Sequence, residues 1–169
     1  MKTRKGFSLI EIVLYIAIFS IISIFVVGSI LIIIRVSTNI RLARNLNISS
    51  RTAMERIIRE IRLADSIDGT STFGSHPGYL KLNTIDANNN PTTMEFFLTG
   101  SNLMIQEGAS SPESLTSSNV TVSNLVFYQI SPSTASKAIK VEMTLTSILP
   151  NGQQKSEKFY DTVVLRRSY

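Results

Sequence analysis

The residues from Ile12 to Ile34 form an apolar run of 23 residues, which constrains the fold more than any other part of the chain. Seventeen of them are Ile, Leu, Val or Phe. As a helix, the run would be about 35 Å long, enough to cross a hydrocarbon core of roughly 30 Å. Insertion gains roughly 0.3 to 0.6 kcal/mol for each such residue, so one acid at the edge, Glu11, is tolerated. Because the backbone must satisfy its own hydrogen bonds in lipid, the run is predicted to be a membrane-spanning helix.

A secretory signal peptide is the main alternative for such a run. Signal peptides have apolar cores of about 7–15 residues and end at a small-residue cleavage site. This run is longer and lacks such a site. The basic residues nearest to it are Lys2, Arg4 and Lys5 on one side and Arg35, Arg41 and Arg44 on the other. The first group favours an N-terminus in the cytoplasm and an extracytoplasmic C-terminal domain, and the second group acts in the opposite sense. We expect a single-pass protein of the cytoplasmic membrane.

The segment that leads into the run, Lys5-Gly6-Phe7-Ser8-Leu9-Ile10-Glu11, resembles the processing signal of type IV pilins and their relatives. A basic leader, Gly-Phe, a hydroxyl residue, two aliphatic residues and Glu stand in fixed order before a membrane span. The resemblance implies that a prepilin peptidase cuts between Gly6 and Phe7 and that Phe7 is then N-methylated. It also implies that Glu11 pairs with the N-terminal amine of a neighbouring subunit during filament assembly.

Elementary chemistry agrees with these roles. Gly6 has no side chain, so the backbone at the cleavage site can lie extended in a protease cleft. Cleavage leaves a positive amine at Phe7, about one helical turn from Glu11. A lone carboxylate in hydrocarbon is costly and needs a partner. The alternative is that Glu11 sits at the membrane interface and is stabilised only by the dipole of the helix N-terminus.

The helix is predicted to continue beyond the membrane as an amphipathic element. No proline occurs before Pro77. Apolar residues recur at helical spacing, at Val36, Ile40, Ala43, Leu46, Met54, Ile57, Ile61 and Ala64. This pattern predicts one apolar stripe on a helix that runs from Phe7 to about Ile67. The stripe must pack on a surface, and only the C-terminal region can supply one.

The C-terminal region has the alternating pattern and turn signals of short strands. The expected strands are Tyr79–Asn83, Thr93–Leu98, Leu103–Gln106, Val120–Ile130, Ala138–Ile148 and Lys155–Arg166, with a loop at Gly108–Ser118. An antiparallel meander on the upper helix follows, hence an α+β fold. Its expected parts are a cleaved basic leader (1–6), a transmembrane and assembly helix (7–34), an amphipathic continuation (35–68) and a β-rich globular domain (69–169).

Within the pilin-like superfamily, the segment from Arg51 to Ile67 looks most like the J-type minor pseudopilins of type II secretion. The later blocks NLVFYQI, AIKVEMTLTS and FYDTVVLRR are similar to that group in order and character. The resemblance implies a minor subunit that primes or caps a type II secretion or type IV pilus-like filament. Its partners would be other pilin or pseudopilin subunits and an inner-membrane assembly platform. Minor pilins of DNA uptake or adhesion share the same layout and are the alternative.

The sequence offers no constellation for catalysis or cofactor binding, so we expect neither. His76 is the single histidine, and there is no cysteine. The run from Asp86 to Asn90 has the spacing of a calcium loop, but Pro91 and Phe97 replace the turn glycine and the bidentate acid, which favours a polar hairpin turn. The net charge of +5 falls to +2 without the three basic residues of the leader. A nucleic-acid partner for the arginines between Arg35 and Arg62 is therefore weakly supported, and a solvated helix face is favoured.

Overall fold

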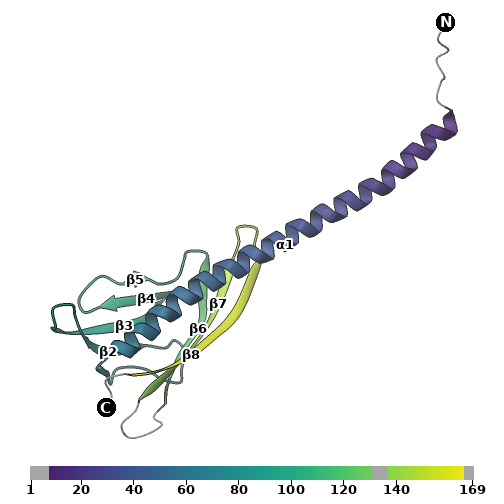
Figure 1. Ribbon diagram of the computed structural model, residues 1–169. Helices are drawn as coiled ribbons and strands as arrows, with labels where there is room; N and C mark the ends of the chain where they lie inside the picture. Colours follow the sequence, from purple (N-terminus) through teal and green to yellow (C-terminus); the bar gives the residue numbers. More distant parts are fainter. Residues whose placement is uncertain (1–7, 131–136, 166–169) are drawn as a thin grey trace. The chain divides into compact units, whose positions relative to one another are not determined.

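The computed structural model describes residues 8–130 and 137–165, and the chain forms two compact units, Met1–Ile40 and Arg41–Tyr169 (Figure 1). One helix, α1 (Leu9–Leu63), contributes to both units. All strands belong to the second unit: β1 (Ser66–Ile67), β2 (Leu80–Ile85), β3 (Pro91–Thr99), β4 (Asn102–Glu107), β5 (Glu113–Ser114), β6 (Val120–Ile130), β7 (Ala138–Ile148) and β8 (Gln154–Val164). A long N-terminal helix packed on antiparallel sheets confirms the predicted α+β class.

The helix α1 ends at Leu63, earlier than the Ile67 expected from its apolar stripe. Ser66 and Ile67 instead form β1 and pair with β2. The N–H of Asp65 donates to the carbonyl of Asn83 at 2.9 Å, so the backbone that follows the helix is hydrogen-bonded to β2. Tertiary pairing thus overrides a helical pattern at its end.

The strands form two sheets rather than one continuous meander. The first has the order β1-β2-β3-β4-β5 and the second β6-β7-β8, and all neighbours are antiparallel. The separation follows from β5, which lies within the expected loop Gly108–Ser118 and occupies the outer edge of β4. Because that edge is taken, β6 begins a new sheet. The bounds of β6 and β7 are those predicted.

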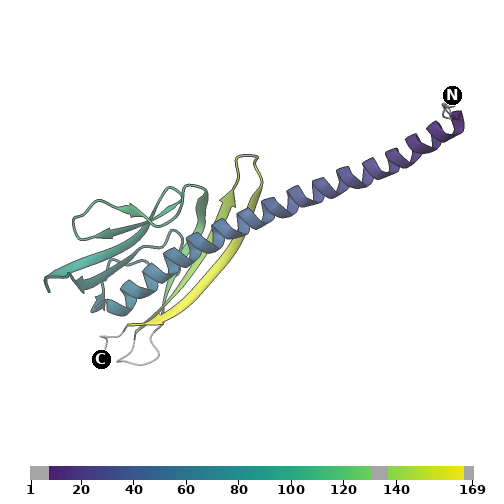
Figure 2. The ribbon, with the colours of Figure 1, turned by 45° about the horizontal axis from the view of Figure 1, so that its top comes forward.

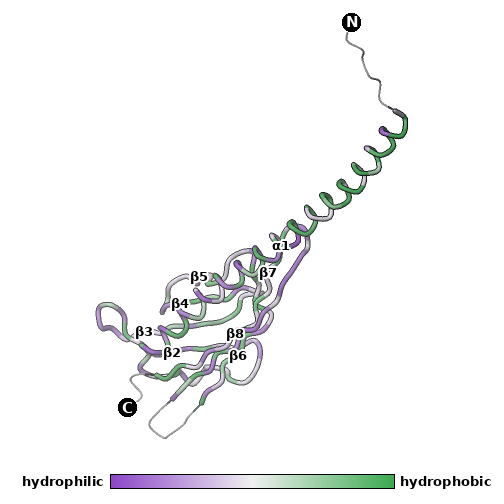
Figure 3. Tube along the Cα trace, turned by 45° about the vertical axis from the view of Figure 1, so that its right-hand side comes forward, coloured by the Kyte–Doolittle hydropathy of each residue, from purple (hydrophilic) through white to green (hydrophobic). Residues whose placement is uncertain are grey.

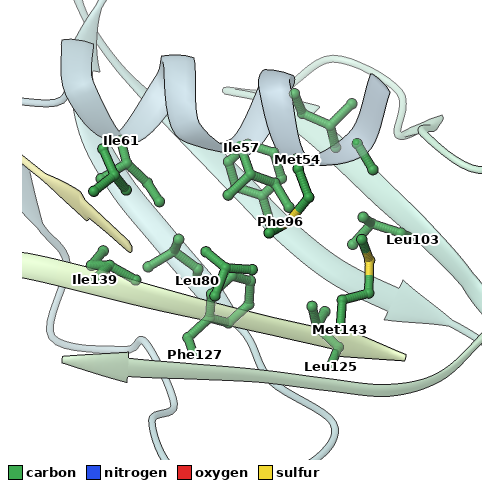
Figure 4. Close-up of a cluster of buried hydrophobic side chains, with 14 of the residues drawn as sticks. Met54, Ile57, Ile61, Leu80, Phe96, Leu103, Leu125, Phe127, Ile139 and Met143 are labelled. Atoms are coloured by element: carbon green, nitrogen blue, oxygen red, sulfur yellow. The ribbon is translucent and has the colours of Figure 1, made fainter. Parts of the chain in front are cut away.

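The core lies between the C-terminal part of α1 and the two sheets (Figure 4). Met54, Ile57 and Ile61 of α1 point toward the strands: Met54 and Ile57 lie over Phe96 of β3, and Ile61 lies over Leu80 of β2 (Figure 4). Phe96, Leu80 and both isoleucines are fully buried, so each side chain is removed from water on every side. Burial of this kind is worth roughly 1.5–3 kcal/mol for each large apolar side chain.

The buried face of α1 begins at Leu42, which the predicted stripe does not include. Val36 and Ile40, the first two residues expected in the stripe, are 51% and 62% exposed. They belong to the first unit, together with the apolar run. The covered stripe is therefore shorter than the pattern suggests.

A loop before β2 closes tightly over β6. The N–H of Gly78 donates to the carbonyl of Leu125 at 2.9 Å, and the N–H of Leu125 donates to Nδ1 of His76 at 3.0 Å. A Cβ at Gly78 would lie 2.9 Å from the ring of Phe127 and 3.0 Å from the carbonyl oxygen of Leu125. This contact requires glycine, because both neighbours belong to the packed β6 strand.

Candidate functional site

The N-terminal turn of α1 places Glu11 at the third helical position. The carbonyl of Ser8 accepts hydrogen bonds from the N–H groups of Glu11 (3.0 Å) and Ile12 (3.3 Å), so Ser8 occupies the N-cap position of the helix. Ser8 and Glu11 therefore have the spacing of a capping box, in which an acid near the helix N-terminus is favourable. The Glu11 side chain is exposed and forms no hydrogen bond or ion pair with a described residue. The predicted cleavage and methylation residues, Gly6 and Phe7, lie outside the described residues.

The part of α1 that follows Glu11 consists mostly of hydrophobic residues, green in Figure 3, and their side chains are exposed. Phe19, Ile24 and Phe25, for example, are 72%, 74% and 73% exposed. Among the described residues, α1 is the helix that is long and apolar enough to cross a membrane. This surface has the chemistry of a segment whose solvent is lipid or the apolar side chains of other helices.

The serine hydroxyl groups inside the apolar run are satisfied by the helix itself. Ser20 donates to the carbonyl of Ile16 at 2.7 Å, Ser23 to that of Phe19 at 2.8 Å, and Ser29 to that of Phe25 at 2.9 Å. A hydroxyl bonded four residues back does not need water, which lowers the cost of placing it in hydrocarbon. The helix also continues without a break through Gly28.

The arginines of the second unit lie on the solvent side of α1. Arg41, Arg44 and Arg62 are exposed and form no ion pair with a described residue. Arg51 pairs with Glu55 at 2.7 Å, and Arg56 and Arg59 approach Glu60 at 3.0 and 3.3 Å. The arginines are therefore spread along one helix, and two of them, Arg59 and Arg62, line a common open groove, together with Glu55, Ile58 and Leu63.

The turn from Asp86 to Asn90 uses its carboxylate internally. Oδ1 of Asp86 accepts from the N–H groups of Asn88 (2.7 Å) and Asn90 (2.8 Å), and Nδ2 of Asn90 lies 3.2 Å from Oδ2. The backbone hydrogen bond from Asn90 is the main reason why the pKa of Asp86 lies below its ordinary value. Within residues 8–130 and 137–165, no group of three or more His, Asp or Glu side chains is arranged to hold a metal ion.

A polar cluster on the outer face of β2 and β3 has the most perturbed ionisation. Burial and a hydrogen bond to Glu95 (2.7 Å) raise the pKa of Tyr79 to about 12. Burial alone would raise the pKa of Glu95, but the bonds from Tyr79 and from Lys81 (3.0 Å) lower it. A tyrosine that holds its proton beside a paired carboxylate links two strands and supplies neither a base nor a nucleophile at neutral pH.

Two features were not among those expected from the sequence. The N-cap position of Ser8 has a signal in the sequence, its spacing to Glu11. The contact of His76 with β6 joins residues 49 positions apart and has no local signature.

Comparison with known proteins identifies the N-terminal region. Residues 1–27 match the prokaryotic N-terminal methylation motif. The match supports a type IV pilin-like class for the chain, with processing by a prepilin peptidase and assembly with other pilin-like subunits. No match was found among curated proteins or among solved structures.

Proposed function

We propose that the chain is a structural, non-enzymatic subunit of a pilin-like filament. A prepilin peptidase cuts after Gly6, and Phe7 becomes the N-methylated first residue. The apolar part of α1 holds the subunit in the cytoplasmic membrane, with the second unit on the extracytoplasmic side, until assembly extracts it. The observation that carries this proposal is the methylation motif, which runs directly into an exposed apolar helix.

Glu11 gives the assembly step its chemistry. The mature N-terminus carries a positive amine at Phe7, and the carboxylate of Glu11 has no described partner within its own chain. Two subunits side by side could each satisfy the other's charge, and the apolar surfaces of neighbouring α1 helices would exclude water from the pair. The pairing would also fix the axial register of adjacent helices, because a displaced subunit would bury an unpaired charge.

The finer role that we propose is that of a minor subunit, which primes or caps a type II secretion or type IV pilus-like filament. This part rests on the resemblance of Arg51–Ile67 to the J-type minor pseudopilins. The inner-membrane assembly platform and the more abundant filament subunits would be its partners.

Mass spectrometry of the protein from peptidase-competent cells tests the proposal. The N-terminal peptide is expected to begin at Phe7 and to carry one added methyl group. The matched control is Gly6→Val, whose branched side chain would block the extended backbone at the cleavage site and leave the leader attached. An intact Met1 on the unmodified chain in the same cells would refute the proposed processing.

A further inference from the structure

Three of the four outer sheet edges are very short or are covered by other parts of the chain. The five-stranded sheet ends on its two sides in the two-residue strands β1 and β5. The edge of β6 receives the N–H groups of Gly74 and Gly78 at the carbonyls of Phe127 (2.8 Å) and Leu125 (2.9 Å). The carbonyl of Ser101 accepts from the N–H of Val122 at 2.7 Å. The fourth edge is β8, which runs along the outside of the three-stranded sheet (Figure 2).

The register of β8 shows which of its backbone groups face outward. The N–H of Leu165 donates to the carbonyl of Lys137 (3.0 Å), and the N–H of Leu149 donates to that of Gln153 (2.9 Å). Hydrogen-bonded pairs alternate with non-bonded pairs in an antiparallel ladder. Odd-numbered residues of β8 therefore bond to β7, and the N–H and C=O groups of even-numbered residues point to the outer edge. One of these outward groups, the N–H of Thr162, donates to the carboxylate of Asp161 at 2.7 Å. The others form no hydrogen bond with a described residue.

The β8 edge lacks several of the features that usually prevent strands from adding. Proteins protect edges with very short strands, prolines, bulges or charged side chains, lysines above all. β8 has 11 residues and no proline, and its register with β7 is unbroken. Its two lysines are already paired: Lys155 with Glu157 and Lys158 with Glu142, each at 2.6 Å.

We propose that β8 accepts an extended segment of a neighbouring pilin-like subunit, which adds as a fourth strand to the three-stranded sheet. Outward N–H and C=O groups that repeat every second residue, about 7 Å apart, match another extended polypeptide and no lipid or sugar. This inference rests on the proposed function, because the filament supplies the neighbouring subunit.

The surroundings of β8 add one chemical requirement for the incoming segment. An open groove of about 490 Å³ beside the strand is lined by Thr162, Val163, Val164 and Arg62 of α1. Because Arg62 is exposed and forms no ion pair with a described residue, a carboxylate on the incoming strand would complement it. The carboxylate of Asp161 satisfies the N–H of Thr162 in the single subunit and gives way to a carbonyl when the strand adds.

Amide hydrogen exchange on the full-length chain tests the inference, with β8 as its own control. In detergent micelles, the odd-numbered amides of Glu157, Phe159 and Asp161 are expected to exchange slowly, and the even-numbered amides of Lys158 and Tyr160 quickly. In assembled filaments, the even-numbered amides should slow to the rate of the odd ones. If the amides of Lys158 and Tyr160 exchange as fast in filaments as in micelles, the inference is wrong and the proposed function is unaffected.

Two variants at one position separate the backbone from the side chain. Lys158→Pro removes an outward N–H and leaves the hydrogen bonds to β7 in place, whereas Lys158→Thr removes the charge and keeps that N–H. Incorporation into filaments is expected to fall about tenfold for the proline variant alone, since one hydrogen bond is lost and the ring obstructs the edge. Equal incorporation of both variants would contradict the inference. Should the proline variant not fold, the exchange rates of the unmodified chain decide.

Site-specific crosslinking identifies the neighbour. The chain has no cysteine, so Lys158→Cys introduces a single reactive site. A short crosslinker in intact filaments is expected to join this cysteine to an extended segment of a second copy or of another filament subunit, and either product supports the inference. Crosslinks to lipid alone would contradict it. If the unmodified chain enters no filament at all, the proposed function fails and the inference fails with it.

Discussion

At the scale of single residues, the carboxylate of Glu11 carries the sharpest prediction. Glu11→Leu makes the apolar run more hydrophobic, so insertion should persist, and cleavage after Gly6 should persist because its flanking residues are unchanged. Recruitment into filaments should fail, since truncating one side of a buried charged pair costs about 3–5 kcal/mol. The measurement is subunit crosslinking at matched expression, with the extent of cleavage followed in the same samples.

Glu11→Asp is the matched control, because it retains the negative charge at the same helical position. It should recover part of the crosslinking that Glu11→Leu loses. If the cleaved Glu11→Leu chain assembles normally, Glu11 serves only to stabilise the N-terminus of α1 through the helix dipole.

Roles that depend on local sequence can be proposed from the sequence alone. Gly6, Phe7 and Glu11 stand within six positions of one another, in a motif matched over residues 1–27, and their individual roles stay predictions. The hydrogen bond between the N–H of Leu125 and His76 depends on where β6 lies after folding, so no sequence pattern near His76 predicts it. The open edge of β8 is equally invisible, because it results from what the rest of the chain leaves uncovered.

At the scale of elements, the outer face of β7 and β8 should respond to acid. Lys158 donates to Glu142 at 2.6 Å, and this bond lowers the pKa of Glu142 from its ordinary value of 4.5. The same pair raises the pKa of Lys158. A carboxyl group whose pKa is lower in the folded state stabilises the fold at a pH above its pKa in the unfolded chain, near 4.5. That stabilisation is lost as the pH falls through the pKa of the folded state. Glu142→Gln should therefore lower the thermal midpoint at pH 7 and have little effect at about pH 3.

Thermal unfolding at the two pH values measures this effect. Glu113→Gln is the control, because Glu113 is exposed and forms no ion pair with a described residue. Glu113→Gln should leave the thermal midpoint almost unchanged at both pH values. A Glu142→Gln deficit of equal size at both pH values would show that packing, and not the charge, is responsible.

The long strands could be predicted from the sequence, and the two-residue strands could not. Eleven residues of β6 or β7 contain enough alternation to define a strand, as Val141 and Met143 beside Glu142 show. β1 and β5 have two residues each and exist only because longer strands offer them hydrogen-bonding partners. The division into two sheets depends on β5, so it was missed for the same reason.

At the scale of the whole molecule, the second unit should fold without the membrane segment. A fragment that begins at Arg41 keeps Leu42, Leu46 and the rest of the buried stripe, and it omits the exposed apolar run. We expect a soluble fragment with a helix and antiparallel strands by circular dichroism and one cooperative unfolding transition. A fragment without helical signal would contradict the assigned core.

Two isoleucines on the same helix make a matched test of that core. Ile57 is fully buried and Ile48 is 56% exposed. In the fragment, Ile57→Ala should cost about 2–5 kcal/mol of unfolding free energy, and Ile48→Ala should cost far less. Similar losses for both would mean that α1 does not pack as described.

The distance along the chain between α1 and its covering strands affects the order in which the second unit folds. The buried stripe of α1 is synthesised first, but Ile139, Met143 and Val163 cover it from the last third of the sequence. Contacts between such distant residues form late and slowly, because a long loop must close before they are made. If the second unit is exported as we propose, the stripe must remain uncovered while most of that unit crosses the membrane. During that interval the nascent subunit is exposed to aggregation, and a chaperone or the lipid surface would have to shield it.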